Sequence, residues 1–101
     1  MTFYEILKSV GVPAFYGVVT EDDIKPPFLI YLFGMLNTFK ADNLVYEENP
    51  TYTVELYFNQ KDLDLEQRLK SKLTEYGYTY DQSEDAWIDG ENMFVTYFDI
   101  W

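Results

Sequence analysis

The sequence contains no cysteine and no histidine. Without cysteine, disulfides, thiolate nucleophiles and cysteine-based zinc or iron–sulfur sites are excluded. Without histidine, the commonest general base and metal ligand is also missing. The 5 glycines are scattered and form neither a phosphate-binding loop nor a dinucleotide-binding motif. These absences remove the usual routes to catalysis, so we expect a protein that is not an enzyme and needs no cofactor.

Basic residues are scarce as well. The 7 Lys and Arg face 18 Asp and Glu, which gives a formal net charge of -11. A phosphate backbone is bound by a basic face, so this charge disfavours ordinary nucleic-acid binding and predicts good solubility. The longest apolar run, Phe28–Phe33, is far shorter than the roughly 20 residues that span a bilayer, and the first residues do not resemble a signal peptide. We expect a protein made in the cytoplasm, with no membrane partner.

Aromatic residues, in contrast, are abundant at 20% of the chain, with 10 Tyr, 8 Phe and 2 Trp. The core of one small domain cannot enclose them all, and aromatic residues at a surface are typical of protein–protein interfaces. Alternatively, tyrosine serves only as a strand former on half-buried faces. The candidates for interface use are Tyr31, Tyr57, Tyr78 and Tyr80.

The clearest pattern lies between residues 50 and 80. Apolar and polar residues alternate from Thr51 to Phe58, which indicates a strand with one buried face. Leucines at 65, 69 and 73 then recur at helical spacing. We expect an amphipathic helix over about 64–76, capped by Asp64 and ended by Gly77.

Weaker patterns predict the remaining elements. Thr2 and Glu5 form a capping box for an N-terminal helix that continues to Val10. Asp89-Gly90 is a strong hairpin signal within residues 86–100. The chain is expected to form one domain, 1–101, of the α+β class, with both helices packed on a mixed or antiparallel sheet. The other expected segments are strands at 14–20, 28–33 (covered on both faces), 44–46 and 77–80, a long loop at 34–43, and polar turns at 47–50 and 81–85.

Acidic residues gather at 21–23, 47–48 and 81–85. All three clusters fall in predicted turns, where acidic residues are common. A weak calcium or magnesium site remains an alternative, although the spacing of an EF-hand loop is absent. A carboxylate-pair enzyme is a further alternative, but a domain this small rarely provides the cleft.

Four of the seven basic residues, Lys61, Arg68, Lys70 and Lys72, lie in or just before the predicted amphipathic helix, where Glu66 and Lys70 are spaced for an ion pair. The simplest interpretation is a solvated helix face. The functional hypothesis is that this face meets an acidic face of a neighbouring copy in a head-to-tail ring. The residues that we predict at such an interface are Phe39, Lys40, Tyr57, Arg68 and Lys72.

The order of these features resembles a known family. After the N-terminal helix comes a Pro-Pro-aromatic start to a strand, Pro26–Tyr31, and then a loop with Ala41–Asn43. The strand Tyr52–Tyr57 follows, and Lys61–Glu66 leads into a helix that ends near Tyr76–Tyr78. This pattern resembles, over residues 3–80, the small tail-completion proteins of long-tailed phages and prophages of Gram-positive hosts, the tail-terminator or head–tail joining group.

The resemblance implies a structural virion protein without catalytic residues. Such a protomer forms a ring, a hexamer in the family, that caps the tail tube and contacts the tail-tube protein and the head connector or neck protein. An acidic lumen would let DNA pass without specific binding. An alternative from another class is an acidic protein that mimics DNA or inhibits a basic partner.

Overall fold

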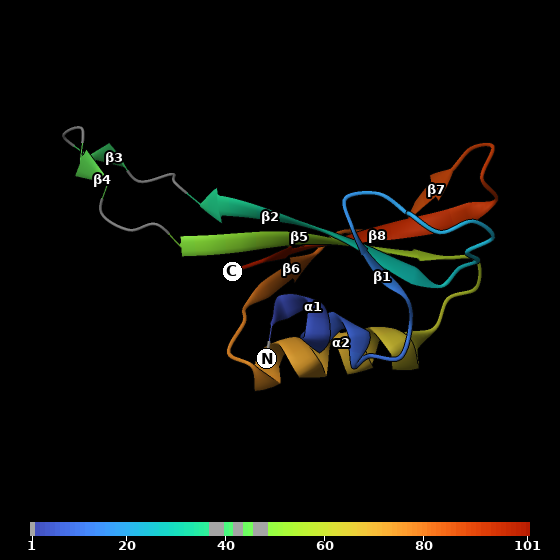
Figure 1. Cartoon of the computed structure of the whole chain (residues 1–101), viewed down its shortest axis with the longest axis horizontal. Coiled ribbons are helices and arrows are strands. Elements are labelled where there is room, and N and C mark those ends of the chain that lie inside the picture. Colours follow the sequence, from blue (N-terminus) through green and yellow to red (C-terminus); the bar gives the residue numbers. More distant parts are fainter. Residues whose placement is uncertain (1, 37–39, 42–43, 46–48) are drawn as a thin grey trace.

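The computed structural model describes residues 2–36, 40–41, 44–45 and 49–101, with side chains over 2–34 and 51–101. A six-stranded mixed sheet carries both helices on one face, and a narrow arm projects from one end of the sheet (Figure 1). The predicted α+β architecture, with an N-terminal helix and one longer helix packed on the sheet, is confirmed.

The sheet has the strand order β1-β2-β5-β8-β6, and β7 also pairs with β8. Only β1 and β2 run parallel; the other neighbours are antiparallel. The elements are α1 (Phe3–Lys8), β1 (Ala14–Tyr16), β2 (Phe28–Leu36), β3 (Lys40–Ala41), β4 (Leu44–Val45), β5 (Asn49–Phe58), α2 (Leu63–Glu75), β6 (Tyr80–Gln82), β7 (Ala86–Ile88) and β8 (Met93–Ile100).

Local side-chain hydrogen bonds define where the helices begin. The capping box of Thr2 and Glu5 is present at α1, as predicted. The predicted cap of α2 at Asp64 was wrong, because Asp62 caps this helix by accepting from the backbone N–H of Leu65 at 3.1 Å. Asp62 has the extended backbone that a cap needs, whereas Asp64 already lies in the first helical turn.

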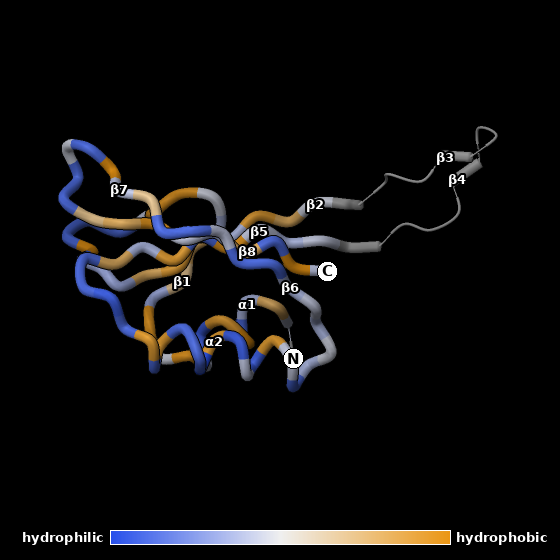
Figure 2. Tube along the Cα trace, turned by 180° about the vertical axis from the view of Figure 1, so that it is seen from behind, coloured by the Kyte–Doolittle hydropathy of each residue, from blue (hydrophilic) through white to orange (hydrophobic). Residues whose placement is uncertain are grey.

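One face of the sheet, here called the helix face, contains the main core. The alternation predicted for β5 is confirmed, since Val54, Leu56 and Phe58 point to this face and are buried. Hydrophobic and hydrophilic residues alternate along α2, which turns its apolar stripe to the sheet (Figure 2). The buried residues of this core are Phe3, Leu7, Val10, Ala14, Leu29, Val54, Leu56, Phe58, Leu65, Leu69, Leu73, Phe98 and Ile100.

The opposite face, here called the open face, is covered only in part. Phe15, Phe28 and Ile30 form a second cluster there, packed against the 17–27 connection between β1 and β2. Leu32, on the same face, lies at the margin of that cover and is 43% exposed. Phe33 lies on the helix face, where its ring contacts Tyr52, and is 46% exposed. The prediction that residues 28–33 are covered on both faces is therefore wrong for Leu32 and Phe33, because the connection covers Leu32 incompletely and the helix-face core does not enclose Phe33.

The projecting arm is formed, among the described residues, by 34–36, 40–41, 44–45 and 49–51, and it extends β2 and β5 beyond the rest of the sheet (Figure 1). The β5–β8 ladder begins at Tyr52, so Gly34–Leu36 and Asn49–Thr51 pair only with each other among the described residues. Strands β3 and β4 form a separate two-stranded ladder. The loop predicted at 34–43 and the turn at 47–50 were thus wrong where β2, β3 and β5 occupy them, because cross-strand pairing continues after the alternating pattern fades.

The C-terminal part follows its turn signals closely. The hairpin of β7 and β8 is confirmed, and Gly90 in its turn has a φ of 85°. Gly77 ends α2 with a φ of 86°, which glycine adopts without strain. The polar turn predicted at 81–85 starts later than expected, since Asp81 and Gln82 belong to β6.

The leucine stripe of α2 provides a test of the core. Leu69 is fully buried, whereas Leu63 on the same helix is 69% exposed. We expect Leu69→Ala to lower the free energy of unfolding by about 2–5 kcal/mol, through lost burial and a cavity. The matched variant Leu63→Ala should change it by less than about 0.5 kcal/mol. Urea unfolding followed by circular dichroism measures both, and equal losses would contradict this packing.

Candidate functional site

The interface residues predicted from the sequence do not form one site. Tyr57 lies on the open face, near the 17–27 connection, whereas Arg68 and Lys72 lie on α2, which packs on the other face. Lys40 belongs to β3 in the arm, and Phe39 lies outside the described residues. The structure therefore separates these residues into different surfaces.

Tyr57 already has partners within its own chain. Its ring stacks on Phe28 with centroids 4.9 Å apart, and its hydroxyl donates to Oε1 of Glu55 at 2.6 Å. Burial, together with the hydrogen bond and charge of Glu55, raises the pKa of Tyr57 far above its ordinary value. Tyr57 thus contributes to the packing of the open face, and its use at an interface stays a prediction.

Two of the three basic residues of α2 also have partners within the chain. Arg68 donates from Nε to the backbone oxygen of Val10 at 3.2 Å, which ties α2 to the end of α1. Lys72 lies 3.6 Å from the carboxylate of Glu75. Each helix contains equal numbers of acidic and basic residues, so neither has a net charge, and the whole charge of -11 lies outside them.

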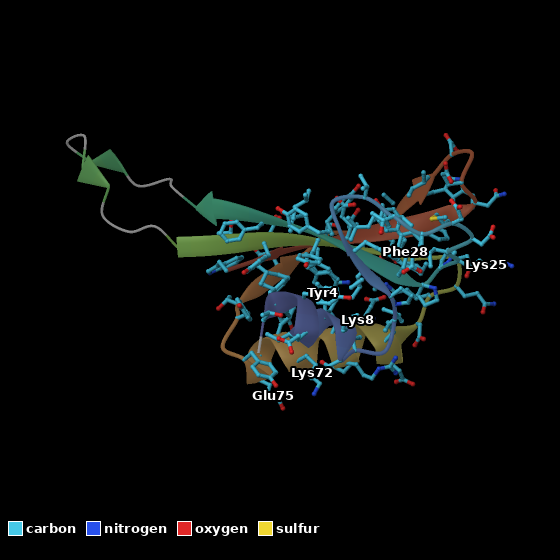
Figure 3. All side chains as sticks on the ribbon, viewed as in Figure 1. Tyr4, Lys8, Lys25, Phe28, Lys72 and Glu75 are labelled. Atoms are coloured by element: carbon cyan, nitrogen blue, oxygen red, sulfur yellow. The ribbon has the colours of Figure 1, made fainter. Side chains whose placement is uncertain are left out.

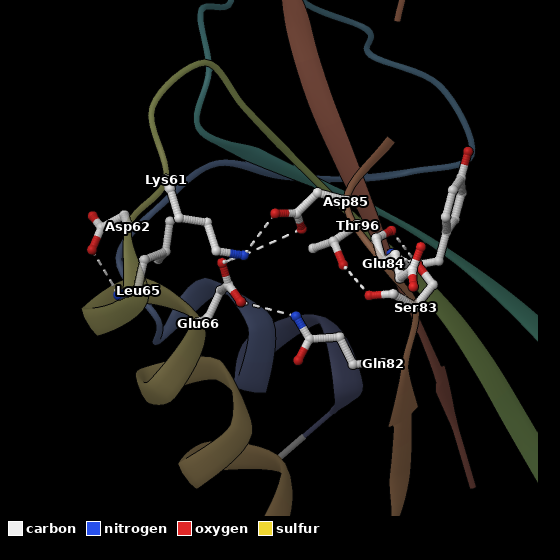
Figure 4. Close-up of polar contacts among 10 residues, drawn as sticks. Lys61, Asp62, Leu65, Glu66, Gln82, Ser83, Glu84, Asp85 and Thr96 are labelled. Carbon is white, nitrogen blue, oxygen red and sulfur yellow. Dashed lines mark hydrogen bonds and ion pairs between the residues drawn. The ribbon is translucent and has the colours of Figure 1, made fainter. Parts of the chain in front are cut away.

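The ion pair predicted between Glu66 and Lys70 was wrong. Glu66 is only 4% exposed, and its Oε2 lies 2.6 Å from Nζ of Lys61. Lys61 also donates to both carboxylate oxygens of Asp85, and Gln82 donates to Oε1 of Glu66 at 2.9 Å (Figure 4). This Lys61 network joins α2 to β6 and to the segment that follows it, and helix spacing gave no signal for a lysine that lies before the helix.

This network raises the pKa of Lys61. Partial burial alone would lower the pKa of Lys61, but the hydrogen bonds and charges of Glu66 and Asp85 outweigh burial and raise it. The folded protein therefore holds this proton more tightly than an unfolded chain does.

A groove, here called the tyrosine groove, runs along the free side of β1. Three tyrosines line it: Tyr16 and Tyr31 are 5.1 Å apart between centroids, and Tyr4 and Tyr31 are 6.3 Å apart. Lys8 lies over the Tyr4 ring at 5.8 Å, and Figure 3 labels both residues. The groove encloses about 790 Å³, and burial first, then its tyrosine neighbours, raises the pKa of Tyr31.

The exposed tyrosines of this groove were missed by the sequence reasoning. Tyr4 and Tyr16 are 41% and 53% exposed. Of the four tyrosines that the sequence suggested, Tyr31 lines the groove, whereas Tyr78 and Tyr80 pack against the core, beside Phe3 and Phe98 respectively. The available signal was the position of Tyr4 and Lys8, one helical turn apart and outside the apolar stripe of α1.

The acidic residues give no metal centre within the described ranges, where no group of three or more candidate ligands comes together. Asp81 and Asp99 face each other across β6 and β8 on the open face, beside a depression of about 360 Å³ that Thr51 and Thr53 help to line. Like charges in directly opposed positions destabilise a sheet. Among the same residues, no helix is long and apolar enough to cross a membrane.

Comparison with known proteins does not assign the chain to a family. No family model matches it. A search of curated proteins finds no match either. Any proposal of function therefore depends on the surfaces described above.

The Lys61 network makes a testable contribution to stability. We expect Lys61→Met to lower the free energy of unfolding by about 1–2 kcal/mol, because Glu66 stays buried with one partner lost. The value is modest because Lys61 is partly exposed. The pKa of Lys61 is higher in the folded protein than in the unfolded chain. Its contribution to stability is therefore complete below the ordinary lysine pKa of about 10.4, and it is lost as the pH rises through the higher folded pKa.

Urea unfolding at neutral and strongly alkaline pH measures this difference. The control Lys25→Met, at an exposed position in the 17–27 connection, should be neutral. Adding Glu66→Met to Lys61→Met should restore most of the loss, because no charge then stays buried. A Lys61→Met protein as stable as the wild type at neutral pH would refute the network's role.

Proposed function

We propose that this chain is a non-enzymatic structural protein of a phage tail. It assembles with copies of itself into a ring, a hexamer as in the resembling family, on the end of the tail tube. The ring stops growth of the tube and presents a surface to the head connector or neck protein, so the protein resides in the virion. The observation that supports this proposal is the projecting arm.

The arm is, in its described residues, a two-stranded ribbon with unpaired edges, and such a ribbon is stabilised by pairing with another chain. A two-stranded ribbon is marginally stable alone, and unpaired strand edges are templates for strand addition. On one side of the ribbon, the β1–β2 pairing ends at Tyr31 of β2. Beyond it, the N–H of Phe33 donates to the Tyr16 hydroxyl at 3.2 Å. On the β8 side, the ladder ends at Tyr52. Past these points, both edges of the described ribbon are available to a neighbour.

The charge distribution fits a ring through which DNA passes. All of the net charge lies outside the helices, and a wall with excess carboxylates repels phosphate groups. DNA then moves through the lumen without specific binding. Neutralising the lumen carboxylates should slow DNA passage, whereas unchanged ejection would count against an acidic lumen.

One observation favours a second candidate function. The open face exposes Asp81 and Asp99 beside the partly buried Glu55. Such a face suits an acidic protein that mimics DNA or inhibits a basic partner. This alternative predicts a monomer or dimer that competes with DNA for a basic protein, whereas the ring proposal predicts larger assemblies and no such competition.

Replacement of the arm tests its role directly. Gly34 and Thr51 are paired across β2 and β5, so residues 35–50 can be replaced by an Asn-Gly turn that closes the shortened hairpin. We expect this variant to keep the fold and melting temperature of the domain and to lose self-association, measured by light scattering and electron microscopy. Assemblies identical to those of the wild type would contradict the proposal.

The function itself is tested in the phage or prophage that encodes the chain. Deletion of the gene should give overlong tails or heads without tails in electron micrographs. Complementation with the full chain should restore normal particles, whereas the variant without the arm should not. Normal particles after deletion would overturn the proposed function.

A further inference from the structure

We propose that the two opposite edges of the sheet form a second contact between copies, needed in addition to the arm, with the β6 edge of one copy bound in the tyrosine groove beside β1 of the next. This inference rests on the proposed ring and specifies the surfaces that build it. The occupant of the groove is therefore a second copy of this chain.

The backbone of β1 is free on the side of the groove. Leu29 donates to the backbone oxygen of Pro13 at 2.8 Å, and Gly17 donates to that of Tyr31 at 3.0 Å. Alternate residues of a parallel strand bond to the same neighbour, so Ala14 and Tyr16 direct their backbone groups away from β2. The oxygen of Tyr16 accepts from Val18, which leaves the N–H and C=O of Ala14 and the N–H of Tyr16 for a new strand.

The β6 edge is free in a matching way. Thr79 and Trp101 exchange both backbone hydrogen bonds, at 2.8 and 2.9 Å. In an antiparallel ladder the bonded pairs alternate, so Tyr80 and Gln82 turn their N–H and C=O groups outward. Each edge therefore offers at least two donors and an acceptor to a strand that lies beside it.

The side chains around the two edges differ in charge. The tyrosine groove is lined by three tyrosines and by Lys8 and Glu21, whose charges cancel. Tyrosine is favoured at interfaces because it combines apolar area with a polar end. The β6 edge is flanked by exposed carboxylates at Asp81 and Glu84. Two β6 edges would repel each other, whereas the groove has no net charge and offers Lys8 to a carboxylate of the β6 edge.

The positions of the edges determine the type of assembly. Strands β1 and β6 stand at opposite ends of the sheet order. A contact between two different surfaces is heterologous, so each copy binds one neighbour through β1 and another through β6. Such contacts generate a ring when the rotation between copies closes.

Charge exchange tests the pairing. Lys8→Glu should weaken self-association at least about tenfold, a change of about 1.4 kcal/mol, measured by sedimentation at low salt. Lys25→Glu makes the same charge change at an exposed position outside the groove and should have little effect. Adding Asp81→Lys to Lys8→Glu should restore association, because each contact regains an opposite pair. An unchanged Lys8→Glu assembly would overturn this inference.

Cross-linking locates the contact without depending on charge. A photoreactive benzoylphenylalanine at Tyr16 should cross-link to residues 79–85 of another copy, identified by mass spectrometry. The same group at Lys25, exposed in the 17–27 connection and outside the groove, should not reach that segment. Cross-links from position 16 to the arm, or to no other copy, would overturn the edge pairing.

These outcomes also separate the two proposals. If rings form and cap tails but the cross-links lie elsewhere, only the edge pairing fails. If the wild type stays monomeric at every concentration and its deletion leaves particles normal, the proposed function fails together with it.

Discussion

The packing of α2 against the helix face is the interaction on which the rest of the structure depends. Leu65, Leu69 and Leu73 are fully or almost fully buried against the central strands, and α1 completes this layer with Phe3 and Leu7. Two helices cover one face of a six-stranded sheet and leave the other face to whatever the connections provide. The bare part of the open face is a consequence of this one-sided cover.

Polar contacts then hold the parts that the core does not reach. The Lys61 network fixes the segment after β6 to α2, and Arg68 fixes the end of α1 to the same helix. The Tyr16 hydroxyl accepts from the N–H of Phe33, which adds a contact between β1 and β2 beyond the last paired residues, Tyr16 and Tyr31. These contacts keep both edges of the sheet in fixed positions relative to the core, which a surface for repeated assembly requires.

The sequence predicted the parts of the fold that depend on local pattern. The leucine spacing of α2, the alternation in β5 and the Asp89-Gly90 turn each have a period or a backbone requirement, and the structure confirms them. The extension of β2 and β5 into the arm was missed because the pairing of residues 34–36 with 49–51 leaves no local period in the sequence. The tyrosine groove and the Lys61 network were missed because they join residues far apart in the chain, such as Tyr4 with Tyr16 and Lys61 with Asp85.

The net charge is distributed unevenly over the molecule, because the two helices are neutral. Positive and negative side chains cancel within α1 and α2, whereas carboxylates predominate in the strands and connections. Counterions will therefore accumulate unevenly, and the electrostatic potential will fall off differently on the two sides within a Debye length of about 8 Å at physiological salt. An approaching polyanion is therefore repelled by the strands and connections more strongly than by the two neutral helices.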